Sequence, residues 1–115
     1  MAAVSSKQTD KLNSVKRWVC SGEELTMSLL NSFWNMNLNN GTIVSNLYGS
    51  TELTADLTFV SFNSRDQMRR LLNEETILPI GRPISNSKFY LLDENLNKVE
   101  IEGEIGEIYA GGVAL

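Results

Sequence analysis

Histidine is absent from this 115-residue sequence, which also contains a single cysteine, Cys20, and only two prolines. Without histidine, the chain cannot build a Ser/His/Asp or Cys/His nucleophilic site or an imidazole-ligated zinc site. One cysteine excludes an internal disulfide and a cysteine-cluster metal site. No apolar run approaches the roughly 18 residues that span a bilayer, and residues 1–7 lack a signal-peptide core. We therefore expect a cytoplasmic protein without a membrane partner.

The charge balance is mildly acidic, with 14 acidic against 10 basic residues and a net charge of −4. Because no basic block is present, the sequence argues against a nucleic-acid partner. Hydrophobic residues make up 42% of the chain. A chain of this length buries roughly 65% of the surface that its unfolded form exposes, which is enough for one modest core.

The first half of the sequence predicts a β–α–β unit. Residues 15–20 read as a short strand, followed by a capping box in which Ser21 accepts a helical N–H bond and Glu24 reaches back to the serine. Asn39-Asn40-Gly41 ends the expected helix, and residues 42–47 form the second strand. Such a crossover favours parallel strands. The apolar residues at helical spacing are Leu25, Leu29, Leu30, Phe33 and Trp34.

The remaining chain predicts further β-structure. The expected elements are a strand at 57–62, a surface helix or loop at 64–75, a rigid linker at 79–83, a β-ribbon at 89–99 and a strand at 103–110 that ends in Gly111-Gly112. We expect three parts in all: a disordered N-terminus at 1–11, an α/β part at 12–78 and a smaller β-rich part at 79–115 that is cut short at Leu115.

Two loops carry the chemistry-bearing residues. Tyr48-Gly49-Ser50-Thr51-Glu52 combines an aromatic ring, a glycine, two hydroxyls and a carboxylate, which suit base stacking, phosphate approach and a hard cation. Most such loops are solvated turns, and most capping boxes like that at Ser21-Gly22-Glu23 only cap a helix. Both loops, however, follow predicted parallel strands, so they should open on the same edge of one sheet.

Four single residues outside these two loops also carry expectations. Asp56 opens an apolar stretch, so it either faces solvent or serves as a carboxylate for a cationic ligand. Cys20 is expected to be a small buried hydrophobic residue, because no neighbouring group would lower its pKa. Glu104 and Glu107 are expected on an exposed face of the last strand.

Four ordered segments resemble one family, the adenylate-forming (AMP-binding, acyl-activating) enzymes. Asn46-Leu47-Tyr48-Gly49-Ser50-Thr51-Glu52 resembles their Asn-x-Tyr-Gly-x-Thr-Glu motif, and Ser21-Gly22-Glu23-Glu24-Leu25 is similar to their Gly-Gly-Glu-Ala-Leu segment. Residues 80–86 and 103–112 resemble the two segments that follow. The resemblance covers the chain from about Leu12 onward and implies part of the N-terminal domain, with a parallel β–α–β portion before a smaller β-rich subdomain.

The resemblance implies that ATP activates a carboxylic acid as an acyl-adenylate, which a phosphopantetheine thiol on a carrier domain then accepts. Thr51 and Glu52 would be catalytic, with Thr51 on a phosphate and Glu52 on Mg²⁺. Tyr48 would stack on adenine. The full set of residues implied to bind the nucleotide is Ser21, Gly22, Glu23, Asn46, Tyr48, Gly49 and Thr51.

The acyl pocket implied by the resemblance is lined by Val19, Ser21, Leu47, Ala55 and Asp56. This set resembles pockets that accept β-alanine, whose ammonium would pair with the Asp56 carboxylate. Two alternatives remain open: an acyl-CoA synthetase segment for an uncharged acid, and a non-catalytic, truncated interaction module. The family's phosphate loop, amine-binding aspartate, ribose-binding aspartate and catalytic lysine find no match here, so we expect no turnover from these 115 residues alone.

Overall fold

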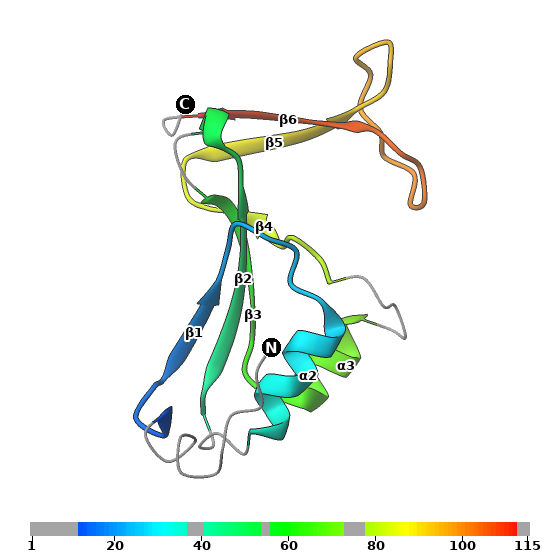
Figure 1. The fold of residues 1–115 in the computed structure, drawn as a ribbon. Coiled ribbons are helices and arrows are strands. Elements are labelled where there is room, and N and C mark those ends of the chain that lie inside the picture. Colours follow the sequence, from blue (N-terminus) through cyan, green and yellow to red (C-terminus); the bar gives the residue numbers. More distant parts are fainter. Residues whose placement is uncertain (1–11, 37–40, 54–55, 73–77, 113–115) are drawn as a thin grey trace.

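The computed structural model describes residues 12–36, 41–53, 56–72 and 78–112, which form a four-stranded mixed sheet with two helices and a separate two-stranded sheet (Figure 1). The first sheet has the strand order β1-β2-β3-β4, and the second pairs β5 with β6. The elements in chain order are β1 (Arg17–Cys20), α2 (Met27–Asn35), β2 (Ile43–Gly49), the short 3-10 helix η1 (Thr51–Leu53), β3 (Asp56–Phe62), α3 (Arg65–Leu72), β4 (Arg82–Pro83), β5 (Ser87–Leu92) and β6 (Glu107–Gly112).

The predicted parallel β–α–β unit is confirmed. Strands β1 and β2 pair in parallel, with Trp18 beside Val44 and Cys20 beside Asn46. Helix α2 connects them and packs on one face of the sheet (Figure 1). The carboxyl ends of both strands therefore point to one edge of the sheet, as the sequence predicted.

The predicted start of the helix at Ser21 is wrong. Helix α2 begins at Met27, and its N-cap is Thr26, whose side-chain oxygen accepts from the Leu29 N–H over 3.2 Å. Gly22 has a φ of +84°, a left-handed conformation that a helix cannot contain. The predicted capping box therefore belongs to an extended loop. The predicted stop at residues 39–41 falls mostly outside the described residues, and α2 itself ends at Asn35.

The core lies between one face of the first sheet and the two helices. The Trp18 and Phe33 rings pack 5.3 Å apart between their centroids, at an interplanar angle of 50°. Helix α3, predicted as a surface helix or loop, contributes two buried side chains, Met68 and Leu72. The buried core residues are Leu25, Leu30, Phe33, Val44, Phe62, Met68, Leu72 and Leu78. No helix among the described residues is long and apolar enough to cross a bilayer.

The segment predicted as a linker at 79–83 ends in an edge strand of the first sheet, β4. Strand β4 pairs antiparallel with β3, so that Pro83 lies beside Thr58 and Arg82 beside Phe59. Thr58 Oγ1 also donates to the Ile80 carbonyl over 2.7 Å. Hydrogen bonds from the neighbouring strands thus fix this segment along the sheet edge. A sequence window has no access to such contacts, because the partners lie more than 20 residues away.

The strands of the second sheet are shifted from their predicted positions: β5 begins at Ser87, before the expected start at 89, and β6 begins and ends later than expected. Strand β6 starts at Glu107 and includes the glycine pair at 111–112 that was expected to end it. Residues 101–103 form a turn before it, closed by a hydrogen bond from the Glu104 N–H to the Ile101 carbonyl over 3.2 Å. Both Glu104 and Glu107 are exposed, but only Glu107 lies on the last strand as predicted, because Glu104 precedes β6. None of the described residues of β5 and β6 is buried.

Candidate functional site

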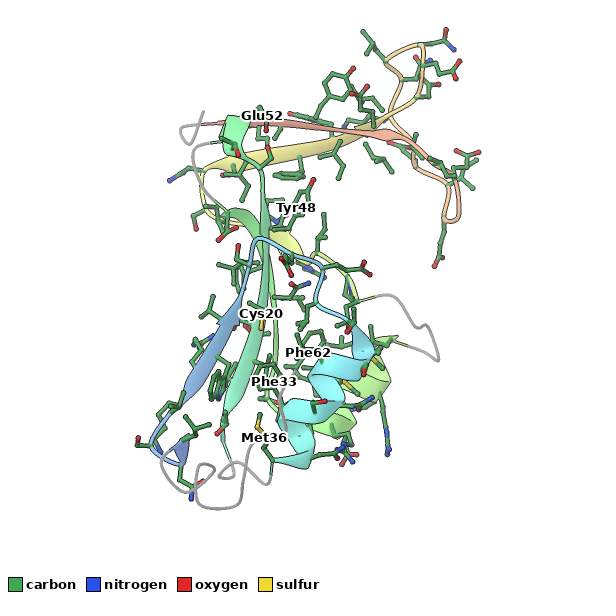
Figure 2. The ribbon with its side chains drawn as sticks, viewed as in Figure 1. Cys20, Phe33, Met36, Tyr48, Glu52 and Phe62 are labelled. Atoms are coloured by element: carbon green, nitrogen blue, oxygen red, sulfur yellow. The ribbon has the colours of Figure 1, made fainter. Side chains whose placement is uncertain are left out.

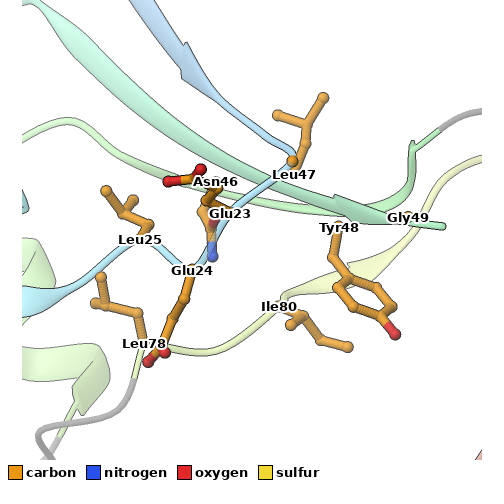
Figure 3. A pocket seen from close by; sticks show the side chains of 10 residues that line it. Glu23, Glu24, Leu25, Asn46, Leu47, Tyr48, Gly49, Leu78 and Ile80 are labelled. Atoms are coloured by element: carbon orange, nitrogen blue, oxygen red, sulfur yellow. The ribbon is translucent and has the colours of Figure 1, made fainter.

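The two loops predicted to face each other border one pocket of about 320 Å³ (Figure 3). One wall is the loop between β1 and α2, and the opposite wall is the end of β2. The segment before β4 closes a third side. The lining residues are Gly22, Glu23, Glu24, Leu25, Asn46, Leu47, Tyr48, Gly49, Leu78 and Ile80.

Five of the seven residues expected around a nucleotide line this pocket: Gly22, Glu23, Asn46, Tyr48 and Gly49. The Tyr48 ring extends beside Ile80 in Figure 3, so a flat aromatic surface borders the cavity next to an aliphatic side chain. Gly22 and Gly49 carry no side chain, which leaves backbone as the wall at these two points. A planar, partly polar ligand suits such a surface. The remaining two expected residues, Ser21 and Thr51, are not among the lining residues.

Asn46 holds the pocket wall in place. Its side chain is 7% exposed, and Nδ2 donates to the Pro79 carbonyl over 3.1 Å. This bond and that from Thr58 to the Ile80 carbonyl attach the segment containing Leu78 and Ile80 to the sheet. The sequence did not predict Leu78 or Ile80 as part of the site. Apolar residues on both sides of Pro79 were the available signal, but their position against β2 depends on these long-range bonds.

Glu52 lies in η1, directly beyond the end of β2 and past Tyr48 (Figure 2). A hydrogen bond from the Ser50 side chain lowers the pKa of the Glu52 carboxyl, and its own backbone N–H adds to this effect. The group is therefore ionised at neutral pH, as a magnesium ligand must be. The described residues contain no cluster of three or more His, Cys, Asp or Glu side chains that could hold a metal ion. Glu52 fits Mg²⁺ only as one ligand that shares the ion with phosphate oxygens and water.

Two residues expected to line the acyl pocket, Val19 and Leu47, have side chains on the other face of the sheet, although Leu47 also borders the pocket described above. Leu47 and Tyr48 are consecutive in β2, so their side chains point to opposite faces. Figure 3 shows Leu47 directed away from Tyr48 and Ile80. Leu47 pairs with Phe59 of β3, whose side chain is 48% exposed, and Val19 of β1 is 58% exposed. This outer face, defined here by Val19, Leu47 and Phe59, is opposite the helices.

Ser21 and Asp56 meet at the end of the outer face. The Ser21 hydroxyl donates to Asp56 Oδ1 over 2.6 Å, although 35 residues separate them in the sequence. Asp56 is half-buried, so it is neither a free surface carboxylate nor a fully buried one. Ala55, the remaining member of the expected acyl set, lies outside the described residues.

A polar cluster that the sequence did not predict lies elsewhere on the first sheet. Arg17 Nη1 donates to Ser45 Oγ over 2.9 Å and to Ser61 Oγ over 3.4 Å. The two serine oxygens are themselves 2.8 Å apart. These three residues come from three neighbouring strands, which explains why no local motif announced them.

Cys20 has no catalytic features. Its side chain packs against the hydrophobic core, and burial raises the pKa of its thiol. A raised pKa keeps the thiol protonated at neutral pH and therefore weakly nucleophilic. Cys20 is half-buried where a buried residue was expected, and its contacts with the core agree with the expected hydrophobic role.

A family model described as AMP-binding enzyme matches residues 1–115. The beta-alanyl-bioamine nonribosomal peptide synthetase ebony of Drosophila melanogaster is 41% identical over 104 residues, which is 90% of this chain and 11% of the Drosophila protein. Zwittermicin A synthase ZmaJ of Bacillus cereus is 37% identical over 109 residues, which is 94% of this chain and 19% of that protein.

Solved structures give the same assignment of the fold. PA1221, an NRPS protein containing adenylation and PCP domains, superposes with a TM-score of 0.71 at 26% identity, over 93% of this chain and 20% of its own. IdnL1 superposes with a TM-score of 0.74 at 20% identity, over 96% of this chain and 21% of its own. The chain thus spans about a tenth to a fifth of the length of the proteins it matches.

Proposed function

Because the chain belongs to the AMP-binding enzyme family and matches part of an adenylation domain, we propose that it contributes a nucleotide site and an acyl site on opposite faces of one sheet. The nucleotide would occupy the pocket beside Tyr48, and the acyl group would lie along the outer face. The loop at 21–23 would serve both, because Gly22 and Glu23 line the pocket while Ser21 bonds to Asp56. This shared loop is the observation that carries the proposal.

The proposed reaction is activation of a small amino acid. An oxygen of the substrate carboxylate attacks the α-phosphorus of ATP, the bond to the bridging oxygen breaks, and pyrophosphate leaves with the electron pair. The products are an acyl-adenylate and pyrophosphate. Tyr48 would stack on the adenine, and Gly22 and Gly49 would allow the backbone to approach the ligand closely. Thr51 is proposed to donate a hydrogen bond to a phosphate oxygen.

Mg²⁺, held by Glu52 together with phosphate oxygens, would supply positive charge that offsets the charge developing on the phosphates. The position of Glu52 directly beyond β2 (Figure 2) supports this role. A phosphopantetheine arm on a carrier domain is the proposed acceptor of the acyl group. The PCP domain present in PA1221 supports a carrier as partner. The need for ATP makes the cytoplasm the proposed location.

β-Alanine is the proposed substrate. The half-buried Asp56 carboxylate would pair with its ammonium group, and Val19 and Leu47 would border its short methylene chain. The name of the Drosophila relative, a beta-alanyl-bioamine synthetase, supports this choice. An uncharged acid would leave the carboxylate without a partner in a partly desolvated site, which disfavours its binding.

The complete adenylation domain that contains this segment provides the test. Asp56→Ala should lower β-alanine-dependent ATP–pyrophosphate exchange by about 100-fold or more, because one charge of a hydrogen-bonded pair is removed. Asp66→Ala is the matched control, since Asp66 is an exposed aspartate in the first turn of α3. Unchanged exchange in the Asp56 variant would refute the choice of substrate. Higher activity of the wild-type enzyme toward an uncharged acid than toward β-alanine would favour the acyl-CoA synthetase alternative.

The isolated 115-residue chain tests the nucleotide pocket separately. We expect weak binding of ATP without turnover, detected as amide chemical-shift changes in a ¹⁵N NMR spectrum at millimolar ATP. The changes should concentrate at Gly22, Glu23, Asn46, Tyr48 and Gly49. A folded chain whose amides do not respond, or respond only in the second sheet, would contradict the pocket assignment and favour an interaction module.

A further inference from the structure

A hydrogen bond joins two strand ends that do not touch through the backbone. Ser21 directly follows β1, and Asp56 opens β3, with β2 between the two strands in the sheet. The Ser21 hydroxyl spans β2 by donating to Asp56 Oδ1 over 2.6 Å. A length near 2.6 Å is typical of a hydroxyl bonded to an ionised carboxylate, which makes a stronger bond than two neutral partners.

The backbone on both sides of this bond is fixed by strand pairing. Cys20, the residue before Ser21, pairs with Asn46, and Asp56 itself pairs with Gly49. Strand pairing does not fix the side-chain rotamer of Asp56, because a half-buried aspartate can adopt several staggered rotamers. The Ser21 bond selects one of them. In that orientation, Oδ1 is engaged and no described residue hydrogen-bonds Oδ2.

Resting on the proposed function, we propose that Ser21 is a positioning residue: its hydroxyl holds the Asp56 carboxylate in one orientation and thereby selects substrates whose ammonium group is on the β-carbon. An ammonium has three donors and no acceptor, so it can engage the remaining oxygen without disturbing the serine bond. An α-ammonium lies one carbon nearer the reacting carboxylate, and a fixed Oδ2 cannot follow it. Specificity for the position of the amine would then come from the serine, and specificity for the presence of an amine from the aspartate.

The test compares Ser21→Ala, Ser21→Thr and Asp56→Ala in the complete adenylation domain. Ser21→Ala should raise KM for β-alanine about tenfold, since a charge-assisted hydrogen bond is lost. It should leave kcat within about twofold and KM for ATP unchanged, because the bond is present equally in ground and transition states. The ratio of kcat/KM for β-alanine to that for α-alanine should fall by about tenfold. Ser21→Thr, which keeps the hydroxyl, should restore that ratio.

A double variant separates positioning from loop structure. In an Asp56→Ala background, Ser21→Ala should cause no further loss, because the group it positions is already absent. Additive losses, a raised KM for ATP in Ser21→Ala, or failure of Ser21→Thr to restore the ratio would overturn the inference. A different result would refute the proposed substrate: unchanged β-alanine-dependent exchange in the Asp56→Ala variant. If Asp56→Ala abolishes exchange while Ser21→Ala matches wild type, only the positioning role is refuted.

Discussion

The two sheets of this chain are held together in different ways. The first sheet has helices on one face and a set of buried side chains between them, such as Leu30, Val44 and Phe62. The second has two strands, and none of its described residues is buried. Several of its apolar side chains are exposed, such as those of Leu91 and Ile108, and Ile105, in the approach to β6, is 94% exposed. A two-stranded ribbon in water is marginally stable by itself.

The difference indicates which part can carry a site. The pocket and the Ser21–Asp56 bond both lie on the sheet that has a core, where strand pairing fixes the backbone. The second sheet relies on local polar contacts, such as the Lys98 ammonium located 5.6 Å from the centre of the Tyr90 ring. Rigid elements position functional groups better than marginal ones. The second sheet should therefore tolerate substitutions that the first does not.

The largest difference should appear when one aromatic residue is removed from each sheet. Phe62→Ala deletes a fully buried ring of β3 and should lower the free energy of unfolding by about 3–5 kcal/mol. Phe89→Ala removes a half-buried ring of β5 and should cost less than about 1 kcal/mol, because less surface leaves water there. Urea unfolding of the 115-residue chain measures both values. Equal losses of unfolding free energy would show that the second sheet belongs to the same cooperative core.

A smaller loss should follow from filling a close approach at the sheet edge. Gly81 has a φ of +88°, and a Cβ built on it would collide with the Phe59 carbonyl oxygen. Gly81→Ala should cost about 2 kcal/mol or more, since the strained φ adds to a contact with backbone that cannot yield. Gly41→Ala is the matched control, because Gly41 has a φ of +100° but nothing within 4 Å of its Cβ position. It should cost about 1 kcal/mol.

Amide exchange locates this effect. The Ile84 N–H donates to the Leu57 carbonyl over 2.9 Å, next to the pairing of β4 with β3. Gly81→Ala should speed exchange at Ile84 more than exchange at the core strand β2. Uniform acceleration in both places would mean that β4 does not detach locally, and that the pocket wall at Leu78 and Ile80 is no weaker than the rest of the sheet.

A loss of about 1 kcal/mol should mark the true start of helix α2. Thr26→Ala removes the side chain that accepts from the Leu29 N–H, and N-cap replacements by alanine cost about this much. Glu24→Ala should leave the free energy of unfolding nearly unchanged, because Glu24, the second residue of the expected capping box, is exposed and lies outside the helix. Thermal unfolding followed by circular dichroism compares the two variants. A larger loss from Glu24→Ala than from Thr26→Ala would restore the capping-box interpretation.

Local patterns were sufficient to predict the part of the fold that positions the pocket. The short apolar runs before Ser21 and before Tyr48 predicted two parallel strands, and the shared direction of these strands put both following loops at one edge of the sheet. Tyr48, Gly22 and Glu23 line the resulting pocket. Alternation along β2 also separates Leu47 from Tyr48, so the two faces were already implied by residue order.

The sequence did not predict the long-range polar contacts. The pattern from Ser21 to Glu24 matched a capping box, yet the hydroxyl of Ser21 bonds to a carboxylate 35 positions away. Asn46 and Thr58 donate hydrogen bonds to the carbonyls of residues 79 and 80. This segment, which was expected to be a linker, therefore forms part of the pocket wall. Such bonds depend on where separate strands meet and leave no periodic signal. The division of the chain at residue 79 stays a prediction.

The weakest effect concerns a turn beside the second sheet that a single carboxylate organises. Asp93 Oδ1 accepts from the backbone N–H groups of Asn95 and Asn97, each over 2.8 Å. The bond from the Asn97 backbone is the largest of the influences that lower the pKa of Asp93. A carboxyl whose pKa is lowered by folding stabilises the folded turn above its unfolded pKa of about 3.9, and that contribution disappears as the pH falls through the lower folded value. Amide shifts of Asn95 and Asn97 should therefore titrate with a midpoint below about 3.9, and Asp93→Asn should abolish the transition. A midpoint at or above that value would mean that the ionised form of Asp93 does not hold the turn, and that the second sheet lacks even this local support.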